Sequence, residues 1–383
     1  MEIRVLKMKS QVAIVTCSTY NQQELFPKVR EAIEFLGGIA KFVKPHSKVL
    51  VKPNLLMAIA PERAITTHPE FVRSVVKLLQ EIGCKIYLGD SPSVFGDNSD
   101  DIQNVYERTG MKRIAEEEKI ELVVFDKRFM QGYFPLAQWI KECDCIVNLP
   151  KFKTHEYMIL TGAVKNLFGL IPGTFKLECH KNFYQPEKFA NMLLDIYEVV
   201  KPAISIVDGI SGIEGNGPAT SGTKRDFGLI VAGEDAVAVD SVLARIMDTP
   251  AEYVYTLKEA ARRNIGVTGV QDIELKGNAV SSCVVERFKR PETSLKQTIK
   301  NNLPAPIINI FKRLLTFHPK IDSDVCRLCE ACVKNCPQKT MSNKEGKITI
   351  DYSQCISCFC CREVCPYAAI GMKKSFLARM LGI

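Results

Sequence analysis

Eight cysteines near the end of the sequence repeat with one spacing and could bind inorganic clusters. The two copies contain Cys326, Cys329, Cys332 and Cys336, then Cys355, Cys358, Cys361 and Cys365, and a proline follows each copy. Three thiolates separated by two residues can each reach a different iron of one [4Fe–4S] cube, while the fourth, on a helical turn, points toward a partner cluster. The repeat therefore predicts two [4Fe–4S] clusters.

Exchange of the fourth cysteine between the copies defines the predicted ligand sets. One set is Cys326, Cys329, Cys332 and Cys365, and the other is Cys355, Cys358, Cys361 and Cys336. Zinc is the alternative, since Cys-x-x-Cys pairs also form zinc ribbons, but zinc does not require this spacing twice with a proline each time. Cys360 lies outside the pattern and is predicted to be a non-ligand. Two clusters held close together form a relay, so we expect electron transfer, with a purely structural role as the alternative.

The spacing of the cysteines resembles that of the bacterial two-cluster ferredoxins over residues 322–372. This resemblance implies a small α+β ferredoxin-like domain. The sequence after Cys336, Pro-Gln-Lys-Thr-Met, is more polar than the Pro-Tyr-Ala-Ala-Ile that follows Cys365. We expect this departure to loosen packing around the first half and to shift its reduction potential.

Length and composition indicate an ordinary globular protein. The chain has 383 residues, 46% of them hydrophobic and 25% charged, which suggests two or three domains. The N-terminal residues lack an apolar signal core, and no stretch approaches the ~18 apolar residues of a membrane span. The six cysteines outside the repeat are scattered, often in apolar runs, and are predicted to be buried side chains in a reducing compartment. We therefore expect a cytoplasmic protein.

Residues 1–283 alternate between short apolar runs and segments of helical periodicity. Strands are predicted at 12–17, 48–52, 85–89, 121–125, 145–149, 203–207 and 228–231. Helices are predicted at 26–36 and 69–82, where apolar residues recur every three or four positions. Strands that are apolar on both faces and separated by helices indicate the α/β class, with a mostly parallel sheet flanked by helices.

Polar side chains follow several of the predicted strands where each strand ends. They are Lys52, Asn54, Asp90, Ser91, Lys151, Lys153, His155 and Asp208. Because ligands of open α/β sheets bind outside the carboxyl ends of the strands, we expect these side chains to gather at one rim of the sheet. The alternative for each residue is a role in capping or closing a turn.

Three familiar nucleotide and radical chemistries lack their motifs. The glycine-rich segment 209–222 is predicted to be a loop that could approach an anion, but Thr223 and Lys224 follow it in the reverse of the order that a nucleotide-hydrolysing phosphate loop requires. The first strand ends at Cys17 without the Gly-x-Gly-x-x-Gly of dinucleotide-binding proteins. The sequence also has no Cys-x-x-x-Cys-x-x-Cys of the kind used with S-adenosylmethionine.

Six motifs distributed over residues 10–280 form one pattern. They are Lys52-Pro-Asn-Leu-Leu56, Thr66-Thr-His-Pro-Glu70, Gly89-Asp-Ser-Pro92, Leu149-Pro-Lys-Phe-Lys-Thr-His155, Gly162-Ala-Val-Lys-Asn-Leu-Phe-Gly-Leu-Ile-Pro-Gly173 and Val207-Asp-Gly-Ile210. The pattern resembles the domain-of-unknown-function (DUF) 362 family, and with the cysteine repeat it resembles the ferredoxin-bearing branch of that family. The resemblance implies the architecture and an iron–sulfur redox role, and it names no substrate.

The residues at the expected rim predict a cleft that accepts a small anionic ligand. Positive charge would come from Lys52, Lys151, Lys153 and Lys165, and hydrogen bonds from Asn54, Thr67, Ser91 and Asn166. His68 and His155 are candidates for proton transfer, and with Lys151 and Lys153 they form the candidate catalytic set. Asp90, Asp208 and Glu214 would either hold a divalent cation or pair with the lysines.

The net charge of +8 is concentrated outside the large domain. We predict an α/β domain over 1–283, a basic linker over 284–320 with a short amphipathic helix at 307–317, a ferredoxin domain over 321–372 and a basic apolar tail over 373–383. The amphipathic segment and the tail suit an anionic membrane surface or a partner protein, with packing between domains as the alternative. Because the large domain is not basic, we expect no nucleic-acid partner.

These observations lead to one leading hypothesis and two alternatives. The leading hypothesis is an electron-transfer protein with two [4Fe–4S] clusters that receives electrons from a donor protein and delivers them at low potential to a partner reductase. The first alternative is a self-contained reductase whose small anionic substrate binds at the strand rim. The second is a module that senses oxygen or iron through loss of its clusters.

Overall fold

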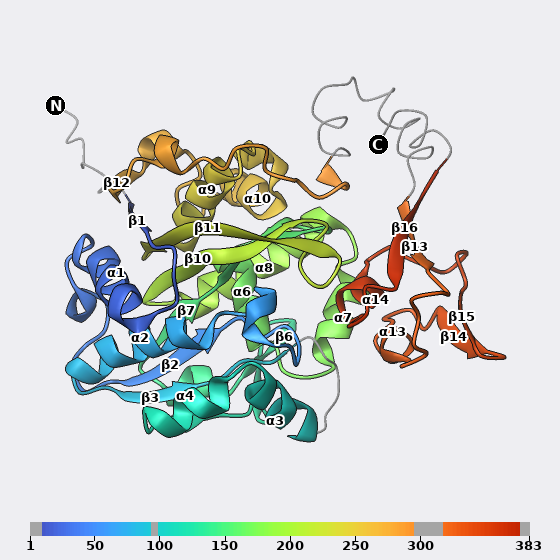
Figure 1. Ribbon diagram of the computed structural model, residues 1–383, viewed down its shortest axis with the longest axis horizontal. Helices are drawn as coiled ribbons and strands as arrows, with labels where there is room; N and C mark the ends of the chain where they lie inside the picture. The colour runs from blue at the N-terminus through green and yellow to red at the C-terminus, as the bar shows by residue number, and fades with distance from the viewer. Residues whose placement is uncertain (1–9, 93–98, 295–316, 376–383) are drawn as a thin grey trace.

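The computed structural model describes residues 10–92, 99–294 and 317–375, which form a large unit and a small C-terminal unit (Figure 1). The large unit contains a ten-stranded sheet whose main path runs β12-β1-β11-β10-β7-β2-β3-β4. Its strands are β1 (Gln11–Thr16), β2 (Lys48–Pro53), β3 (Lys85–Leu88), β4 (Glu121–Leu122), β7 (Cys145–Leu149), β8 (Lys151–His155), β9 (Ile159–Thr161), β10 (Ile204–Gly215), β11 (Gly222–Gly233) and β12 (Glu274–Gly277). A separate hairpin joins β5 (Arg128–Gln131) to β6 (Phe134–Ala137).

The sheet is mostly parallel, as the sequence predicts. Strands β10, β7, β2, β3 and β4 are parallel neighbours, β8 lies parallel to β10, and β12 lies parallel to β1. Antiparallel pairing occurs where β11 contacts β1 and β10, and where β9 contacts β8. The carboxyl ends of the parallel strands consequently meet at one rim, the arrangement that places ligands in open α/β sheets.

Helices cover both faces of the sheet. They are α1 (Gln22–Glu34), α2 (Pro69–Glu81), α3 (Ser99–Arg108), α4 (Met111–Glu117), α5 (Trp139–Glu142), α6 (Ala163–Asn166), α7 (Phe175–Asn182), α8 (Pro186–Val200), α9 (Ala236–Ile246) and α10 (Tyr255–Arg263). Short 3-10 turns occur at Ile39–Lys41, Pro61–Arg63, Leu167–Leu170, Ala251–Tyr253, Val270–Asp272 and Val280–Cys283. Among the helices that the structure describes, none is long and apolar enough to cross a bilayer.

Two apolar cores lie on opposite faces of the sheet because successive strand residues point to opposite sides. In β1, Val12 and Ile14 join the core beneath α8, α9 and α10, whereas Ala13 and Val15 join the core beneath α1 and α2. Helix α2 begins at Pro69, which suits the first helical position, and its apolar face is buried. Burial on both faces explains why these strands are continuous apolar runs.

The C-terminal unit is built from two similar halves. Strand β13 (Phe317–Ile321) pairs with β16 (Ile370–Lys374), and β14 (Met341–Lys344) pairs with β15 (Lys347–Ile350). There are two short helices, α13 (Ala331–Lys334) and α14 (Cys360–Glu363). Each contains the third cysteine of its copy and ends before the fourth. This small α+β unit lies at one end of the molecule, coloured orange to red in Figure 1.

The structure differs from several sequence predictions at the junction of the two units. Residues 317–321 form β13, and residues 373 and 374 belong to β16, so these parts of the predicted linker and tail are strands of the small unit. Val285 and Phe288 pack against the large core, so the start of the predicted linker belongs to the large unit. The amphipathic helix predicted at 307–317 lies outside the described residues except for Phe317 in β13, and the tail lies outside them beyond residue 375.

The glycine-rich loop predicted at 209–222 is limited to residues 216–221 in the structure. Residues up to Gly215 continue β10, Gly222 begins β11, and the two strands pair as a long hairpin. Glycine serves close packing there, because a Cβ on Gly212 would lie 2.0 Å from the Phe152 carbonyl oxygen. Small residues in this segment therefore admit a neighbouring strand rather than an anion.

Candidate functional site

The four cysteines of one predicted ligand set line a single crevice in the small unit. Cys336, Cys355, Cys358 and Cys361 line one space, whose remaining lining includes the apolar side chains of Met341, Ile350 and Phe359. Cys336 comes from the first copy and the other three come from the second. A crevice walled by thiols and apolar groups fits a [4Fe–4S] cluster.

The cysteines of the other predicted set also lie near one another. Burial raises the pKa of Cys332 to about 11, and the neighbouring thiols that raise it further are Cys365, Cys329 and Cys326. No group of three or more His, Cys, Asp or Glu side chains within the described ranges is placed to hold one metal ion. A cluster requires wider spacing, because each thiolate binds a different iron. A [4Fe–4S] cluster supplies one-electron chemistry when it is bound.

Helix α14 connects the cysteine unit to the α/β unit. Arg362 forms a buried ion pair with Glu156, and Glu363 Oε1 lies 3.7 Å from Nε2 of His155. The carbonyl oxygen of Cys365 accepts a hydrogen bond of 2.7 Å from the Thr220 hydroxyl. Arg362 and Glu363 directly follow Cys361, and Cys358 and His155 border one narrow crevice between the units. The set of Cys336, Cys355, Cys358 and Cys361 therefore includes residues that face the α/β unit.

Two of the predicted rim lysines are neutralised by carboxylates. Lys52 Nζ lies 2.7 Å from Asp90 Oδ1, and the other oxygen of Asp90 accepts a 2.7 Å hydrogen bond from the Leu55 N–H. A side chain at position 169 would collide with this pair, since a Cβ on Gly169 would lie 2.1 Å from Asp90 Oδ1. The pair is therefore closed off by backbone, and Lys52 and Asp90 do not present a free charge to a ligand.

Lys151 is the second neutralised lysine, and its partner is Asp208. Lys151 Nζ lies 2.7 Å from Asp208 Oδ2, and Tyr20 donates a 2.8 Å hydrogen bond to Asp208 Oδ1. The backbone N–H of His68 also donates to Asp208, over 2.9 Å. The His68 ring stacks on Tyr20 with centroids 3.7 Å apart, and burial lowers the pKa of His68 to about 4. Asp90, Asp208 and Glu214, which were considered for a divalent cation, thus each have a basic partner. The partner of Glu214 is Arg225.

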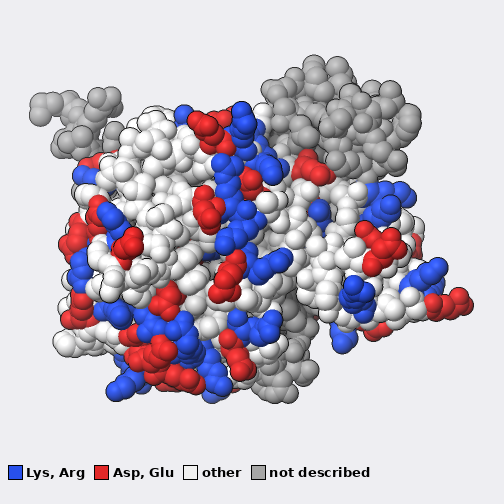
Figure 2. All heavy atoms as spheres, in the orientation of Figure 1, with Lys and Arg blue, Asp and Glu red and all other residues white. Residues whose placement is uncertain are grey.

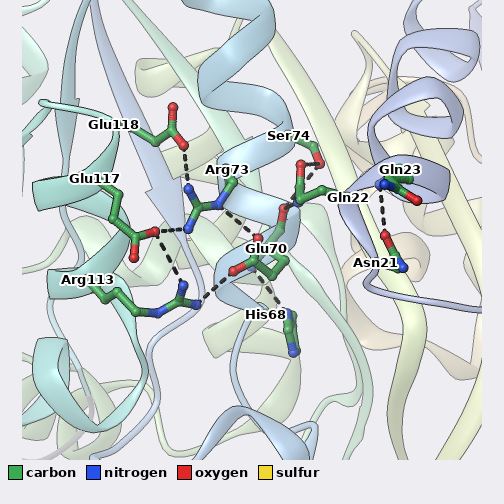
Figure 3. A network of polar contacts seen from close by, with 10 residues as sticks. All are labelled: Asn21, Gln22, Gln23, His68, Glu70, Arg73, Ser74, Arg113, Glu117 and Glu118. Atoms are coloured by element: carbon green, nitrogen blue, oxygen red, sulfur yellow. Dashed lines mark hydrogen bonds and ion pairs between the residues drawn. The ribbon is translucent and has the colours of Figure 1, made fainter.

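The position of His68 follows from its place at the start of α2. Its Nδ1 accepts a hydrogen bond from the Glu70 N–H, the role of a helix cap. Figure 3 shows Glu70 bound to Arg73 and Arg113, which also bind Glu117. This network ties α2 to α4 and holds the first turn of α2 in place. His68 therefore caps helix α2, the alternative role expected from the sequence for the polar rim residues.

Lys153 and the amides form a connected chain of hydrogen bonds below the rim. Lys153 Nζ donates to Asn54 Oδ1 and to the Ile65 carbonyl oxygen, each over 2.7 Å. Asn54 donates to Asn166, and Asn166 donates to Asn148, each over 2.8 Å. Lys153 has neutral acceptors and is fully buried, and burial lowers its pKa to about 7. The Thr67 hydroxyl also belongs here, donating to the Leu149 carbonyl oxygen over 2.8 Å.

His155 lies between the rim and the cysteine unit. Its Nδ1 accepts hydrogen bonds from the N–H groups of Tyr157 and Met158, which places the ring proton on Nε2. That Nε2 is buried and has no hydrogen-bond partner among the described residues. Burial and the nearby charge of Lys165 lower the pKa of His155 well below its ordinary value.

The structure adds residues to this region that the sequence did not single out. Lys176 donates to the carbonyl oxygens of Ser91 and Pro92, and burial lowers its pKa to about 7. His180, one helical turn further along α7, is buried against Phe189. Their spacing of four on one helix was the available signal, but nothing in the sequence linked α7 to the rim. Tyr20 and Glu363 were missed because their partners lie far away in sequence.

Figure 2 shows one face of the molecule, where Lys and Arg side chains alternate with Asp and Glu.

An α/β unit with buried lysines at its rim, joined to a unit with two sets of cysteines, defines an iron–sulfur protein with a role in electron transfer. The chain belongs to the DUF362 family, whose model, a domain of unknown function, matches residues 49–245. A 4Fe-4S dicluster domain matches residues 318–366.

Several characterised sequences are similar to this chain. A thylakoid-associated protein of Synechocystis sp. is 32% identical over 312 residues, covering 80% of this chain and 94% of that protein. The dihydromethanopterin reductase (acceptor) of Methanosarcina mazei is 34% identical over 83 residues, covering 20% of this chain and 35% of that protein. The pyruvate synthase subunit PorD of Methanocaldococcus jannaschii is 39% identical over 56 residues, covering 14% of this chain and 65% of that protein.

Proposed function

We propose that the chain is an electron carrier with two [4Fe–4S] clusters that delivers low-potential electrons to a partner reductase. The outer cluster is held by Cys326, Cys329, Cys332 and Cys365, and the inner cluster by Cys336, Cys355, Cys358 and Cys361. The single observation that carries this proposal is that four cysteines from both copies line one crevice. The domain match over 318–366 and the likeness to a pyruvate synthase subunit support it.

The two clusters have different surroundings, which gives each a role. Cys329 is exposed and stands beside Leu328, which is 41% exposed, so the outer cluster faces solvent and a partner protein. The inner set faces the α/β unit across helix α14. We propose that donor and acceptor proteins exchange electrons with the outer cluster, and that the α/β unit holds the inner cluster in place.

The test is iron and sulfide analysis of anaerobically purified protein with one matched pair of variants. About eight irons per chain are expected in the wild type and about four in Cys336→Ser, because only the inner cluster loses a ligand. Cys360→Ser, a change next to the inner set, is expected to keep about eight. Colourless wild-type protein that contains zinc would refute the proposal.

The carrier role itself is tested by reoxidation. After reduction by a low-potential donor, the protein should be reoxidised only when its acceptor protein is added. A protein that instead changes its binding upon exposure to air and shows no electron delivery would support the sensing alternative.

A second candidate function is a self-contained reductase that acts on a small anionic substrate at the rim. The observation that favours it is the position of His155, at the end of β8, in the same crevice as Cys358 of the inner set. This enzyme would consume substrate without a partner protein. His155→Ala should then abolish turnover while the cluster absorbance stays unchanged.

A cytoplasmic location with peripheral membrane contact is also part of the proposal. The name of the thylakoid-associated relative supports membrane contact, and the basic apolar segments 307–316 and 376–383 are the candidates. Because β16 reaches Lys374, the deletion should begin at residue 376. Loss of sedimentation with anionic liposomes after this deletion would support the contact, and unchanged sedimentation would refute a role for the tail.

A further inference from the structure

The buried lysines behind the inner cluster are not all neutralised. Lys52 and Lys151 have carboxylate partners, whereas Lys153 and Lys176 are held by amide and carbonyl oxygens alone. Lys165 donates no hydrogen bond to any residue that the structure describes, and its ammonium lies 5.9 Å from the centre of the Phe168 ring. Buried cations without counter-charges are costly, so this group of three lysines needs explanation.

Lys165 is the common neighbour of the other unpaired groups. After burial, its charge is the largest cause that lowers the pKa of Lys153, of His155 and of His180. Its own pKa is lowered by burial and raised by Glu363 and Cys360, which places it toward helix α14 and the inner cysteines. Lys165 is half-buried, whereas Lys153 and Lys176 are buried.

Two histidine nitrogens near Lys165 also lack partners. His155 Nε2 and His180 Nδ1 are buried without a hydrogen bond to any described residue, and their side chains are 3% and 5% exposed. Buried polar atoms in folded proteins almost always have a partner, so two free nitrogens beside an unpaired ammonium indicate a missing polar group. The group that satisfies an ammonium and an imidazole N–H together is an anion with several acceptor oxygens.

We propose that Lys165, His155 and His180 form a binding site for a small oxyanion, a phosphate or a carboxylate, beside the inner cluster. The site rests on the second candidate function and narrows it, because it excludes Lys52 and Lys151 as ligand contacts and adds His180. His155 borders a narrow crevice between the units, so the site lies close to the junction of the two units.

The local charges remain favourable to an anion when Glu363 is included. Glu363 Oε1 lies 3.7 Å from His155 Nε2 and contributes one negative charge. Lys165 opposes it, together with Lys153 and Lys176 below about pH 7, where these two lysines are protonated, and Asp90 is already committed to Lys52. A bound oxyanion would offset this excess positive charge in a region of low dielectric constant, where charge pairs interact strongly.

The experiment is anaerobic isothermal titration calorimetry of the cluster-loaded full chain, with inorganic phosphate and succinate as separate probes. Lys165→Met removes the unpaired ammonium, and His180→Phe removes the free nitrogen while keeping an aromatic ring between Phe168 and Phe189. Lys188→Met is the matched control, because Lys188 is an exposed lysine on α8. Iron content and reducibility are measured on every sample.

One saturable site is expected in the wild type and in Lys188→Met, with affinity at least about tenfold weaker in Lys165→Met and in His180→Phe. Without added anion, Lys165→Met should melt at a higher temperature than the wild type, since it no longer buries an unpaired charge. The probe that binds more tightly identifies the ligand as a phosphate or a carboxylate.

Equal affinity in the wild type and both site variants would overturn the proposal, as would no saturable binding of either probe. If binding fails while iron content and reducibility are normal, the electron-carrier function stands and only the anion site is refuted. If the clusters are absent but both probes still bind through Lys165, the redox function is refuted and the anion site stands.

Discussion

At the scale of single residues, the buried lysines divide into paired and unpaired kinds. Lys52 and Lys151 each lie 2.7 Å from a carboxylate oxygen, and their closed pairs hold the strand ends together. Lys153 and Lys165 have no carboxylate within ion-pair distance among the described residues. Charge that is not needed for folding is the usual sign of a site for a ligand or for catalysis.

Removing the carboxylate of the Lys151 pair should destabilise the fold. Asp208→Asn leaves a fully buried ammonium without its counter-charge, and breaking a buried pair in this way costs about 3–5 kcal/mol. Tyr20→Phe is the control, because it removes a hydroxyl that donates to Asp208 and accepts from Lys151 and the Ser211 N–H but leaves the ion pair, and it should cost about 2 kcal/mol. Chemical unfolding measures both. A loss in Asp208→Asn no larger than that in Tyr20→Phe would contradict the assignment of the pair.

The unpaired Lys153 should make stability depend on pH. Burial lowers its pKa from 10.5 to about 7, so between these values the unfolded chain binds a proton that the folded chain does not. Stability therefore rises with pH across this window, by at most about 1.4 kcal/mol per pH unit for one site. Lys153→Met lacks the effect, so the unfolding free energy of the wild type minus that of the variant should increase from pH 7 to 9.

This comparison cancels the titration of other buried groups, which both proteins share. The unfolding free energy of the wild type minus that of Lys188→Met should not change between pH 7 and 9, because Lys188 is exposed. A flat difference for Lys153→Met would show that Lys153 is charged in the folded protein throughout.

At the scale of elements, the sequence predicted those whose character is set by local pattern. Strands β1, β2, β3 and β7 were predicted within about one residue, because burial on both faces makes them unbroken apolar runs. Helices α1 and α2 were predicted from apolar residues at helical spacing. The rim itself followed from the rule that parallel strands end on one side.

Elements stabilised by distant partners were missed. Strand β8 contains Lys151 and Lys153 and was predicted as the polar segment beyond a strand, because its charges are satisfied by Asp208, Asn54 and the Ile65 carbonyl, far away in sequence. The glycines of the β10–β11 hairpin suggested a loop, since the close approach of β8 that requires them is visible only in three dimensions. The contacts of α14 with the α/β unit were unpredictable for the same reason.

Helix α14 should control how firmly the small unit is docked. Glu156→Gln removes the charge that binds Arg362 from the α/β side and leaves the cysteine helix unchanged. Burial raises the pKa of Glu156 to about 7, so the pair is complete at pH 8 and weaker at lower pH. At pH 8 we expect hydrogen exchange in β13, β16 and α14 to increase by about tenfold or more. Glu142→Gln, an exposed change, is the control, and equal exchange in both variants would refute the docking role.

At the scale of the whole molecule, the two cysteine sets have different surroundings. The outer set includes the exposed Cys329, whereas the inner set shares a crevice border with His155 of the α/β unit. In the proposed carrier, the interleaved fourth cysteines, Cys336 and Cys365, would link the two halves of the small unit. An electron that enters at the surface would then reach the outer cluster first and the inner cluster second.

Loss of the outer cluster should consequently slow reduction of the inner cluster by a protein donor but not by a small-molecule donor. Cys329→Ser should slow reduction of the inner cluster by a protein donor such as flavodoxin hydroquinone at least about tenfold, because electron tunnelling from a docked protein depends steeply on distance. Dithionite is small enough to reach the inner cluster through solvent, so its rate should change by less than about twofold. Stopped-flow absorbance under anaerobic conditions measures both rates, with Cys360→Ser as the control that keeps both clusters. If flavodoxin reduces Cys329→Ser as fast as the control, electrons enter at the inner cluster and the order of the relay is reversed.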